Sequence, residues 1–143
     1  MSKNILIPID PQNPELINKA LKLAISQARE KQAVLHVLTV LPGFNNPIVA
    51  SYFPKDAMEQ ALSTTGEKLS SYLEDNVPTD VQTQLHVQTG NPYKQVLNLA
   101  EKLDVGMIVI PSRKRGRADQ VLLGSVTAKV VEQASCSVLV VRS

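Results

Sequence analysis

A basic segment that ends in Gly-Ser is the clearest candidate for chemistry in this sequence. Residues 112–125 read SRKRGRADQVLLGS. The segment places four cations within a short stretch: Arg113, Lys114, Arg115 and Arg117. A helix is predicted to begin at Gly124-Ser125, and its free N–H groups, its dipole and the serine hydroxyl favour an anion. We expect a phosphate site here, and the alternative of a solvated basic loop before an ordinary helix start stays open.

Other reactive side chains in the sequence predict no catalytic site. His36 lies inside an apolar run and is interpreted as a core histidine, whereas His86 is expected on an exposed strand edge. Cys136 has no second cysteine and no metal-ligand spacing around it, so we interpret it as a small buried hydrophobe. No pair of carboxylates shares the predicted site, as general acid and base roles would require. A binding module is therefore favoured over a catalyst.

Strands and helices must alternate along the chain to position the basic segment. The apolar runs predict strands at residues 4–9, 33–40, 81–88, 105–110 and 137–142. The helical spacing of apolar residues predicts helices at 14–30, 56–76 and 92–103 and a fourth from Ser125. Such alternation is typical of a doubly wound α/β domain with a mostly parallel sheet and helices on both faces.

Local signals refine these elements. Asn13-Pro14 and Asn91-Pro92 each predict a cap and a first helical residue. Ser125 is expected to cap the last helix, and Pro111 to end the fourth strand. The last helix is predicted to bury one set of side chains: Val126, Val130, Val131 and Ala134. The strand 81–88 alternates in polarity and is predicted to lie at an edge.

The topology places the candidate site beyond the carboxyl ends of the strands, where the winding direction switches. This predicts a site near Asp10, near residues 37–40 and along 111–125. The connecting segment 41–54 carries Phe44, Tyr52 and Phe53. We expect these rings either to pack over the sheet end or to act as a lid.

Composition excludes several classes of protein. With 143 residues, of which 43% are hydrophobic, the chain fits one domain over residues 1–143. A net charge of +2 and an aromatic content of 3% disfavour nucleic acid as a partner. Apolar runs are too short for membrane insertion, and no secretory signal is expected. A single cysteine allows no internal disulfide, which fits the cytoplasm.

Several segments together resemble the universal stress protein family over the whole chain. They are the opening ILIPID, then VLHV, GNP, LDVGMIVIPS and the tail GSVTAKVVEQASCSVLVV. The resemblance implies a five-stranded Rossmann-like sheet of order 3-2-1-4-5 and a cytoplasmic, ATP-binding regulatory module in the stress response. It also implies a homodimer through the C-terminal strand, which the apolar run at that predicted edge favours independently. An unidentified protein partner would receive the signal.

The family's phosphate motif is altered in this sequence. Members that bind ATP carry Gly-2x-Gly-9x-Gly followed by Ser or Thr, and the same register here gives Pro111, Lys114, Gly124 and Ser125. Lys114 could pair with a phosphate or obstruct it. Two hypotheses stay open: a nucleotide-binding regulator, and a dimeric scaffold that has lost the nucleotide. A hydrolase, at most a weak one, is a third.

The resemblance also implies the residues around the ligand, which is ATP with or without Mg²⁺. Asp10 matches an acidic residue near the nucleotide, with Pro8 and Ile9 beside it, and Val37 matches a position that lines the adenine pocket. The alternatives are a turn cap for Asp10 and an ordinary core role for Val37. The remaining expected contacts follow the motif: Ile110, Pro111, Ser112, Arg113, Lys114, Gly124, Ser125 and Val126.

Overall fold

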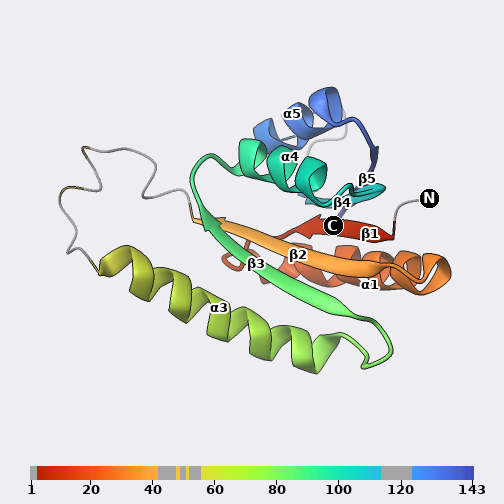
Figure 1. Cartoon of the computed structure of the whole chain (residues 1–143), viewed down its shortest axis with the longest axis horizontal. Helices are drawn as coiled ribbons and strands as arrows, with labels where there is room; N and C mark the ends of the chain where they lie inside the picture. Colours follow the sequence, from red (N-terminus) through yellow and green to blue (C-terminus); the bar gives the residue numbers. More distant parts are fainter. Residues whose placement is uncertain (1–2, 42–47, 49–50, 52–55, 114–123) are drawn as a thin grey trace.

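A single five-stranded sheet organises the chain (Figure 1). The computed structural model describes residues 3–41, 48, 51, 56–113 and 124–143. The strands are β1 (Asn4–Pro8), β2 (Val34–Leu41), β3 (Thr83–Thr89), β4 (Met107–Ser112) and β5 (Ser137–Arg142). The helices are α1 (Pro14–Lys31), α3 (Ala57–Asn76), α4 (Pro92–Lys102) and α5 (Ser125–Gln133). Lys114, Arg115 and Arg117 and the rings of Phe44, Tyr52 and Phe53 lie outside the described residues, so their predicted roles stay predictions.

The strand order is β3-β2-β1-β4-β5, and all four pairings are parallel. This confirms the predicted doubly wound fold. The chain winds outward from β1 to β3, then crosses to β4 on the other side of β1, so the winding direction switches between β1 and β4. Helices cover both faces, which explains why the central strands are apolar almost throughout.

The two faces of the sheet carry separate cores. Below the sheet in the view of Figure 1, α1 and α3 pack on side chains such as Ile7, Leu35 and Val37. Above it, α4 and α5 pack on a second cluster that includes Leu38 and Ile108. Successive side chains along a strand point to opposite faces, so neighbours in sequence belong to different cores.

The starts of the helices differ from the capping predictions. Asn13 stands at the N-cap of α1 but makes no capping hydrogen bond with its side chain. Gly124, not Ser125, is the N-cap of α5, and Ser125 is the first helical residue. The predicted serine cap is therefore wrong, and the Ser125 hydroxyl and backbone N–H both lie at the exposed start of the helix.

Three further predictions need correction. Pro111 does not end β4, because the strand runs on to Ser112 and Pro111 stands in register with Val141. The β1–β4 register covers only Met107 and Ile108 of β4, so the proline has no β1 partner to bond. Val131 is 44% exposed, on the outer side of α5. His86 is half-buried instead of exposed, because it packs against a histidine of the neighbouring strand.

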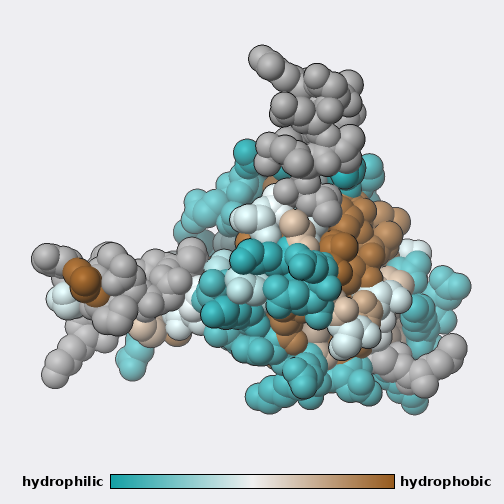
Figure 2. Space-filling model, turned by 90° about the horizontal axis from the view of Figure 1, so that it is seen from above, coloured by the Kyte–Doolittle hydropathy of each residue, from teal (hydrophilic) through white to brown (hydrophobic). Residues whose placement is uncertain are grey.

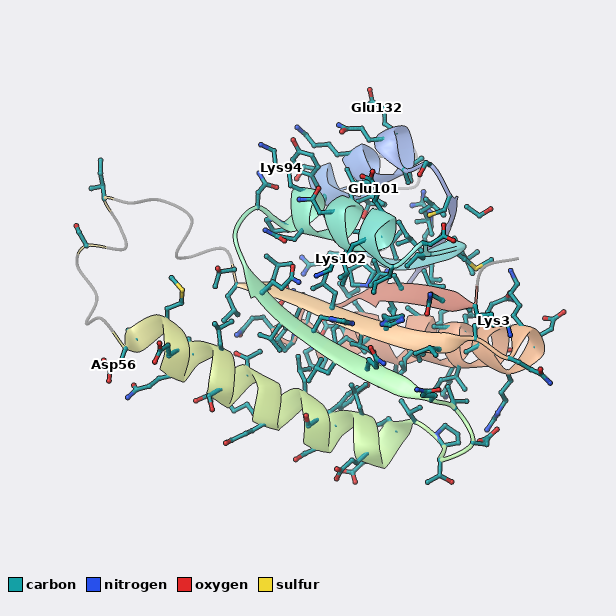
Figure 3. The ribbon with its side chains drawn as sticks, in the orientation of Figure 1. Lys3, Asp56, Lys94, Glu101, Lys102 and Glu132 are labelled. Carbon is teal, nitrogen blue, oxygen red and sulfur yellow. The ribbon has the colours of Figure 1, made fainter. Side chains whose placement is uncertain are left out.

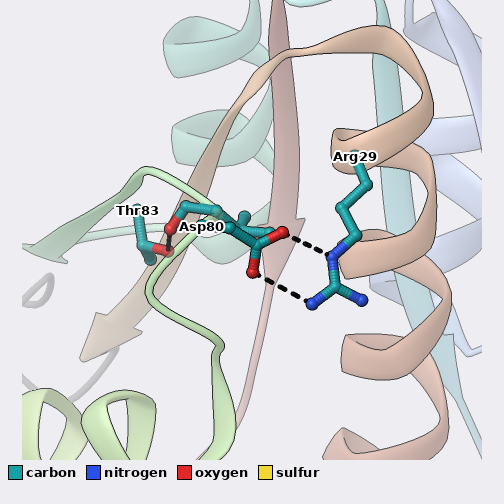
Figure 4. A network of polar contacts seen from close by, with 4 residues as sticks. Arg29, Asp80 and Thr83 are labelled. Atoms are coloured by element: carbon teal, nitrogen blue, oxygen red, sulfur yellow. Dashed lines mark hydrogen bonds and ion pairs between the residues drawn. The ribbon is translucent and has the colours of Figure 1, made fainter.

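The end of the sheet opposite the switch point is held together at the surface by an ion pair (Figure 4). Arg29, in the last turn of α1, donates two hydrogen bonds to Asp80, of 2.8 and 3.0 Å. The Thr83 hydroxyl donates to the carbonyl of Val81 at 3.3 Å beside it. The pair joins α1 to the turn between α3 and β3. Among the helices of the described residues, none is long and apolar enough to cross a membrane.

Candidate functional site

A pocket of about 400 Å³ lies at the carboxyl ends of β1 and β4, where the winding switches. This volume is within the range of small-molecule sites. Its walls come from both of these strands, from β2 and from the starts of α1, α4 and α5. The lining residues are Pro8, Ile9, Asp10, Gln12, Leu16, Ile17, Leu38, Val40, Pro92, Val96, Ile110, Pro111, Val126 and Thr127.

The pocket exists because β1 and β4 separate. Their register covers only two residue pairs, Ile5 with Met107 and Leu6 with Ile108. Beyond these pairs β1 follows β2 instead, and the Ile9 N–H donates to the Leu38 carbonyl at 2.8 Å. The edge of β4 is left open toward β1, and the gap between the two strands becomes the pocket.

Most of the wall is apolar. Leu38 and Val40 of β2, Ile110 of β4 and Val96 of α4 present side chains without hydrogen-bonding groups. Such a surface suits a flat ligand part with a large apolar face. The polar groups lie toward the α1 and α5 starts, so a ligand with one apolar end and one polar end matches the pocket best.

Asp10 occupies a turn at the mouth of the pocket and is already held in place. Its Oδ1 accepts the Gln12 N–H at 2.9 Å, and its Oδ2 accepts the Asn13 Nδ2 at 2.8 Å. The turn interpretation is therefore correct, and it leaves the ligand role open, because an ionised carboxylate has about four acceptor positions and two are used. The turn fixes the direction of the remaining lone pairs.

Arg113 closes a chain of polar contacts across the mouth. Its Nη2 donates to Asn13 Oδ1 at 2.9 Å, and Asn13 in turn donates to Asp10. The contact joins the end of β4 to the start of α1. It fixes the first residue of the basic segment beside the pocket, with its positive charge exposed to solvent.

The start of α5 is the strongest group of donors at the site. The first hydrogen bond within this helix runs from the Ala128 N–H to the Gly124 carbonyl at 2.8 Å, so the N–H groups of residues 125–127 have no acceptor within the helix. The helices α1 and α4 begin with Pro14 and Pro92, each of which removes one such donor. A phosphate near the pocket would therefore find most of its donors on α5.

Gly124 leaves room for close approach to this backbone. A Cβ at this position would meet no atom of the described residues within 4 Å, and the backbone φ of −59° suits any residue. The glycine is thus not required by the fold of the described residues. Its open side is where a ligand could reach the α5 backbone.

The pocket brings together half of the predicted site residues. Pro8, Ile9, Asp10, Ile110, Pro111 and Val126 line it. Gly124, Ser125 and Arg113 lie exposed nearby on α5 and at the end of β4, and Ser112 is buried with 5% exposure. Lys114 lies outside the described residues.

Val37 does not line the pocket. It is fully buried on the face covered by α1 and α3, and its neighbour Leu38 forms the wall instead. The other lining residues that sequence reasoning missed come largely from helix starts: Gln12, Leu16, Ile17, Pro92, Val96 and Thr127. The Asn-Pro signals that predicted the starts of α1 and α4 could have indicated them, since helices that follow parallel strands begin at the carboxyl end of the sheet.

Comparisons with known proteins agree on one family. The model of the family described as "Universal stress protein family" matches residues 1–142. The chain is 31% identical to universal stress protein YxiE of Bacillus subtilis over 99% of this chain and 100% of that protein. It is 32% identical to universal stress protein G of Escherichia coli O157:H7 over 99% of this chain and 100% of that protein.

Solved structures share the fold. Universal stress protein UspA from Lactobacillus plantarum matches with a TM-score of 0.71 and 21% identity over 99% of both chains. A universal stress protein from Archaeoglobus fulgidus in complex with dAMP matches with a TM-score of 0.64 and 19% identity over 96% of this chain and 95% of that one. A universal stress protein in complex with cAMP matches with a TM-score of 0.59 and 19% identity over 99% of this chain and 97% of that one.

Proposed function

We propose that this chain, which belongs to the universal stress protein family, is a regulatory module that binds an adenine nucleotide, with ATP as its ligand, in the pocket between β1 and β4. One observation carries the proposal. An apolar cleft, an oriented carboxylate and a donor-rich helix start meet at the switch point of a doubly wound sheet. Relatives of this fold are described in complex with dAMP and with cAMP, which favours the same ligand class here.

The residues fit the three parts of such a ligand. Leu38, Val40 and Ile110 supply the apolar wall for the base. Asp10 keeps acceptor capacity for ribose hydroxyls. The α5 start, with Gly124 and Ser125, supplies N–H and hydroxyl donors for phosphate, and the adjacent cations add charge. A bound Mg²⁺ would neutralise part of the triphosphate charge.

The site favours holding a nucleotide over hydrolysing it. Among the described pocket residues Asp10 is the one carboxylate, and both of its oxygens already accept hydrogen bonds within the turn. Its remaining acceptor positions would serve the ribose hydroxyls, so these residues offer no second carboxylate to activate water as a general base. We therefore propose a protein that changes its association with a partner protein when nucleotide is bound. The single cysteine favours the cytoplasm as its compartment.

Calorimetric titration with ATP, dAMP and cAMP tests the proposal. Gly124→Val should abolish binding of all three without loss of fold, because a Cβ at this position meets no described atom within 4 Å and the added side chain would fill the approach to α5. Gly66→Ala is the matched control: its Cβ lies 3.9 Å from Val87, in ordinary contact on α3, and binding should be unchanged. No heat from the parent protein at millimolar ATP would contradict the proposal and favour the scaffold hypothesis.

Lys114→Gly tests whether this lysine compensates for the missing motif glycines or obstructs the phosphate site. If the lysine pairs with phosphate, its loss should weaken ATP binding more than AMP binding, by about 1–2 kcal/mol, and the difference should shrink with salt. If the lysine obstructs the site, the same change should strengthen binding. The second result would show that Lys114 opposes nucleotide binding in this chain, as the scaffold hypothesis expects.

We also propose that two copies of the chain pair through β5. This strand has β4 on one side only, and Val138 and Val140 on it are half-buried. Seen from the α4 and α5 side, the described surface carries an apolar patch beside hydrophilic helix surface (Figure 2). An apolar edge strand of this kind is normally covered.

Val140→Lys should convert the dimer to monomer or aggregate in light scattering, because it places a charge in the pairing. Gln84→Lys on β3, the opposite edge, is the matched control, since Gln84 is already exposed. A parent protein that is monomeric at the same concentration would overturn this proposal.

A further inference from the structure

Two histidines, one buried and one half-buried, form a pair on the α4 side of the sheet. His36 of β2 is 3% exposed, and its Nδ1 lies 3.0 Å from Nε2 of His86 on β3. The ring centroids are 5.2 Å apart, with 35° between the planes. They are the two histidines of the chain. Leu38, which lines the pocket, stands in register with His86.

Asn4 determines which nitrogens carry protons. Its Nδ2 donates to the carbonyl of Leu103, just after α4, at 2.8 Å, so its Oδ1 is an acceptor. The His36 Nε2, 2.9 Å from this oxygen, must therefore carry a hydrogen. In the neutral ring Nδ1 is then an acceptor, and the His86 Nε2–H donates to it. One directed chain runs from β3 through β2 and β1 to the end of α4.

The surroundings favour the neutral rings. Burial lowers the pKa of His36 from its usual value, and His86 lowers it further. Burial also lowers the pKa of His86, as does the ammonium of Lys102 at the end of α4. Lys102 lies beside β2 and β3 in Figure 3. The other charged residues of the elements packed on this face are all exposed: Lys94 and Glu101 of α4, Lys129 and Glu132 of α5, Lys3 before β1 and Asp104 after α4.

We propose that His36 and His86 form a proton-sensitive latch that holds the edge strand β3 and the end of α4 to the central strands while both rings are neutral. This inference is independent of the proposed nucleotide binding. One added proton already weakens the latch: the Nδ1–H that a charged His36 gains is accepted only if His86 moves its own hydrogen away from Nε2, and the charge then lies on the buried ring. A second proton would leave two N–H groups and two charges facing each other across 3.0 Å.

The direction of the pH effect follows from linkage. Because the folded pKa values lie below those of the unfolded chain, the unfolded state binds more protons in acid. The stabilisation is complete above about pH 6.5, the ordinary histidine value, and is lost as the pH falls. Between pH 7.5 and 5.5 the unfolding constant should rise about tenfold for each histidine that stays neutral in the fold.

Nuclear magnetic resonance tests the pair directly, because the protein has only two histidine Cε1–H signals to follow. In the folded protein both signals should titrate below pH 6.5. Each titration curve should also show an inflection at the pH where the other histidine titrates, as expected of coupled sites. A single independent step at or above pH 6.5 for either signal would overturn the latch.

Denaturation at several pH values gives the second test. His86→Gln keeps an N–H donor for His36 but cannot titrate, so it should fold at pH 7.5. Between pH 7.5 and 5.5 its unfolding constant should rise about tenfold, whereas that of the parent should rise by up to about 100-fold. The carboxylates contribute equally to both proteins. Equal pH dependence of parent and variant would overturn the proposal.

The single thiol of the chain can report where the structure opens when the histidines take up protons. Cys136 is half-buried against the α4 and α5 core, and this burial raises the pKa of its thiol. Labelling by a pyridyl disulfide, which reacts in acid, should accelerate between pH 7.5 and 5.5 relative to the unfolded chain, and less so in His86→Gln. Acid-independent labelling of the parent would contradict opening at α4.

Discussion

The two faces of the sheet differ in what they bury. On the α1 and α3 side, a continuous apolar cluster joins the strands to α1 along most of its length. On the α4 and α5 side the core is interrupted by the pocket and by polar groups. Of the four buried polar residues in the described chain, His36, Ser112 and Thr127 lie on this second face.

The face covered by α1 and α3 therefore mainly stabilises the fold, whereas the face covered by α4 and α5 carries the groups that can bind a ligand or protons. A closed apolar core tolerates little change in volume, whereas a face with a pocket and a titratable pair gives up some packing to hold a ligand and protons. Two leucines of β2 make the comparison sharp. Leu35 and Leu38 are both fully buried, on opposite faces of the same strand.

Leu35→Ala should have the largest effect on stability. It opens a cavity in the closed core, and we expect a loss of about 3 kcal/mol in the free energy of unfolding. Urea denaturation measures this loss. Nucleotide affinity should be unchanged while the protein is folded, because Leu35 does not line the pocket.

Leu38→Ala should destabilise less, by about 2 kcal/mol, because the space it frees joins a pocket that already exists. The same variant should bind adenosine and ATP more weakly by a similar factor, since the wall for the base is lost. Equal stability losses at Leu35 and Leu38, with affinity intact in both, would erase the distinction between the faces.

Ser125→Ala probes the polar part of the second face. Removing the Ser125 hydroxyl should weaken ATP binding by about 1 kcal/mol and leave adenosine binding unchanged, because only the phosphates need this donor. Thermal unfolding should hardly change, since Ser125 is exposed at the helix start. An equal loss for adenosine would place the serine at the nucleoside instead.

Arg29→Gln should have the smallest effect. The Arg29–Asp80 pair is exposed, with side chains 50% and 60% accessible, and such pairs contribute little. Arg29 lowers the pKa of Asp80, so the small stabilisation is present above about pH 3.8 and fades as the pH falls through the lowered value. In high salt the melting temperatures of parent and variant should coincide.

Most of the fold could be predicted from the sequence because its signals are local. Apolar runs, Asn-Pro helix starts and the alternation of elements are readable within short windows, and they yield the observed order of strands and helices. The cap of α5 was misplaced by one residue, and Val131 was assigned to the wrong side of the same short, valine-rich helix.

The errors at the site have a common physical cause. In β2 both faces are buried, so the pattern VLHVLTV has no alternation that tells Val37 from Leu38. His86 looked exposed because its partner, His36, is 50 residues away in the chain and meets it only across paired strands. Pro111 looked like a strand end because only the separation of β1 from β4 makes a proline harmless there.

The central position of β1 has a consequence for synthesis. One edge of β1 is covered by β2, the next strand in the chain, but its other edge waits for β4, and the Asn4 contact to Leu103 spans 99 residues. Until that length has been made, β1, whose Ile5, Leu6 and Ile7 are buried in the finished fold, has an open edge. Such long-range parallel pairings form slowly. The nascent chain should therefore depend on α1 and β2 to shield β1, and the pocket can form only after α5 has been made.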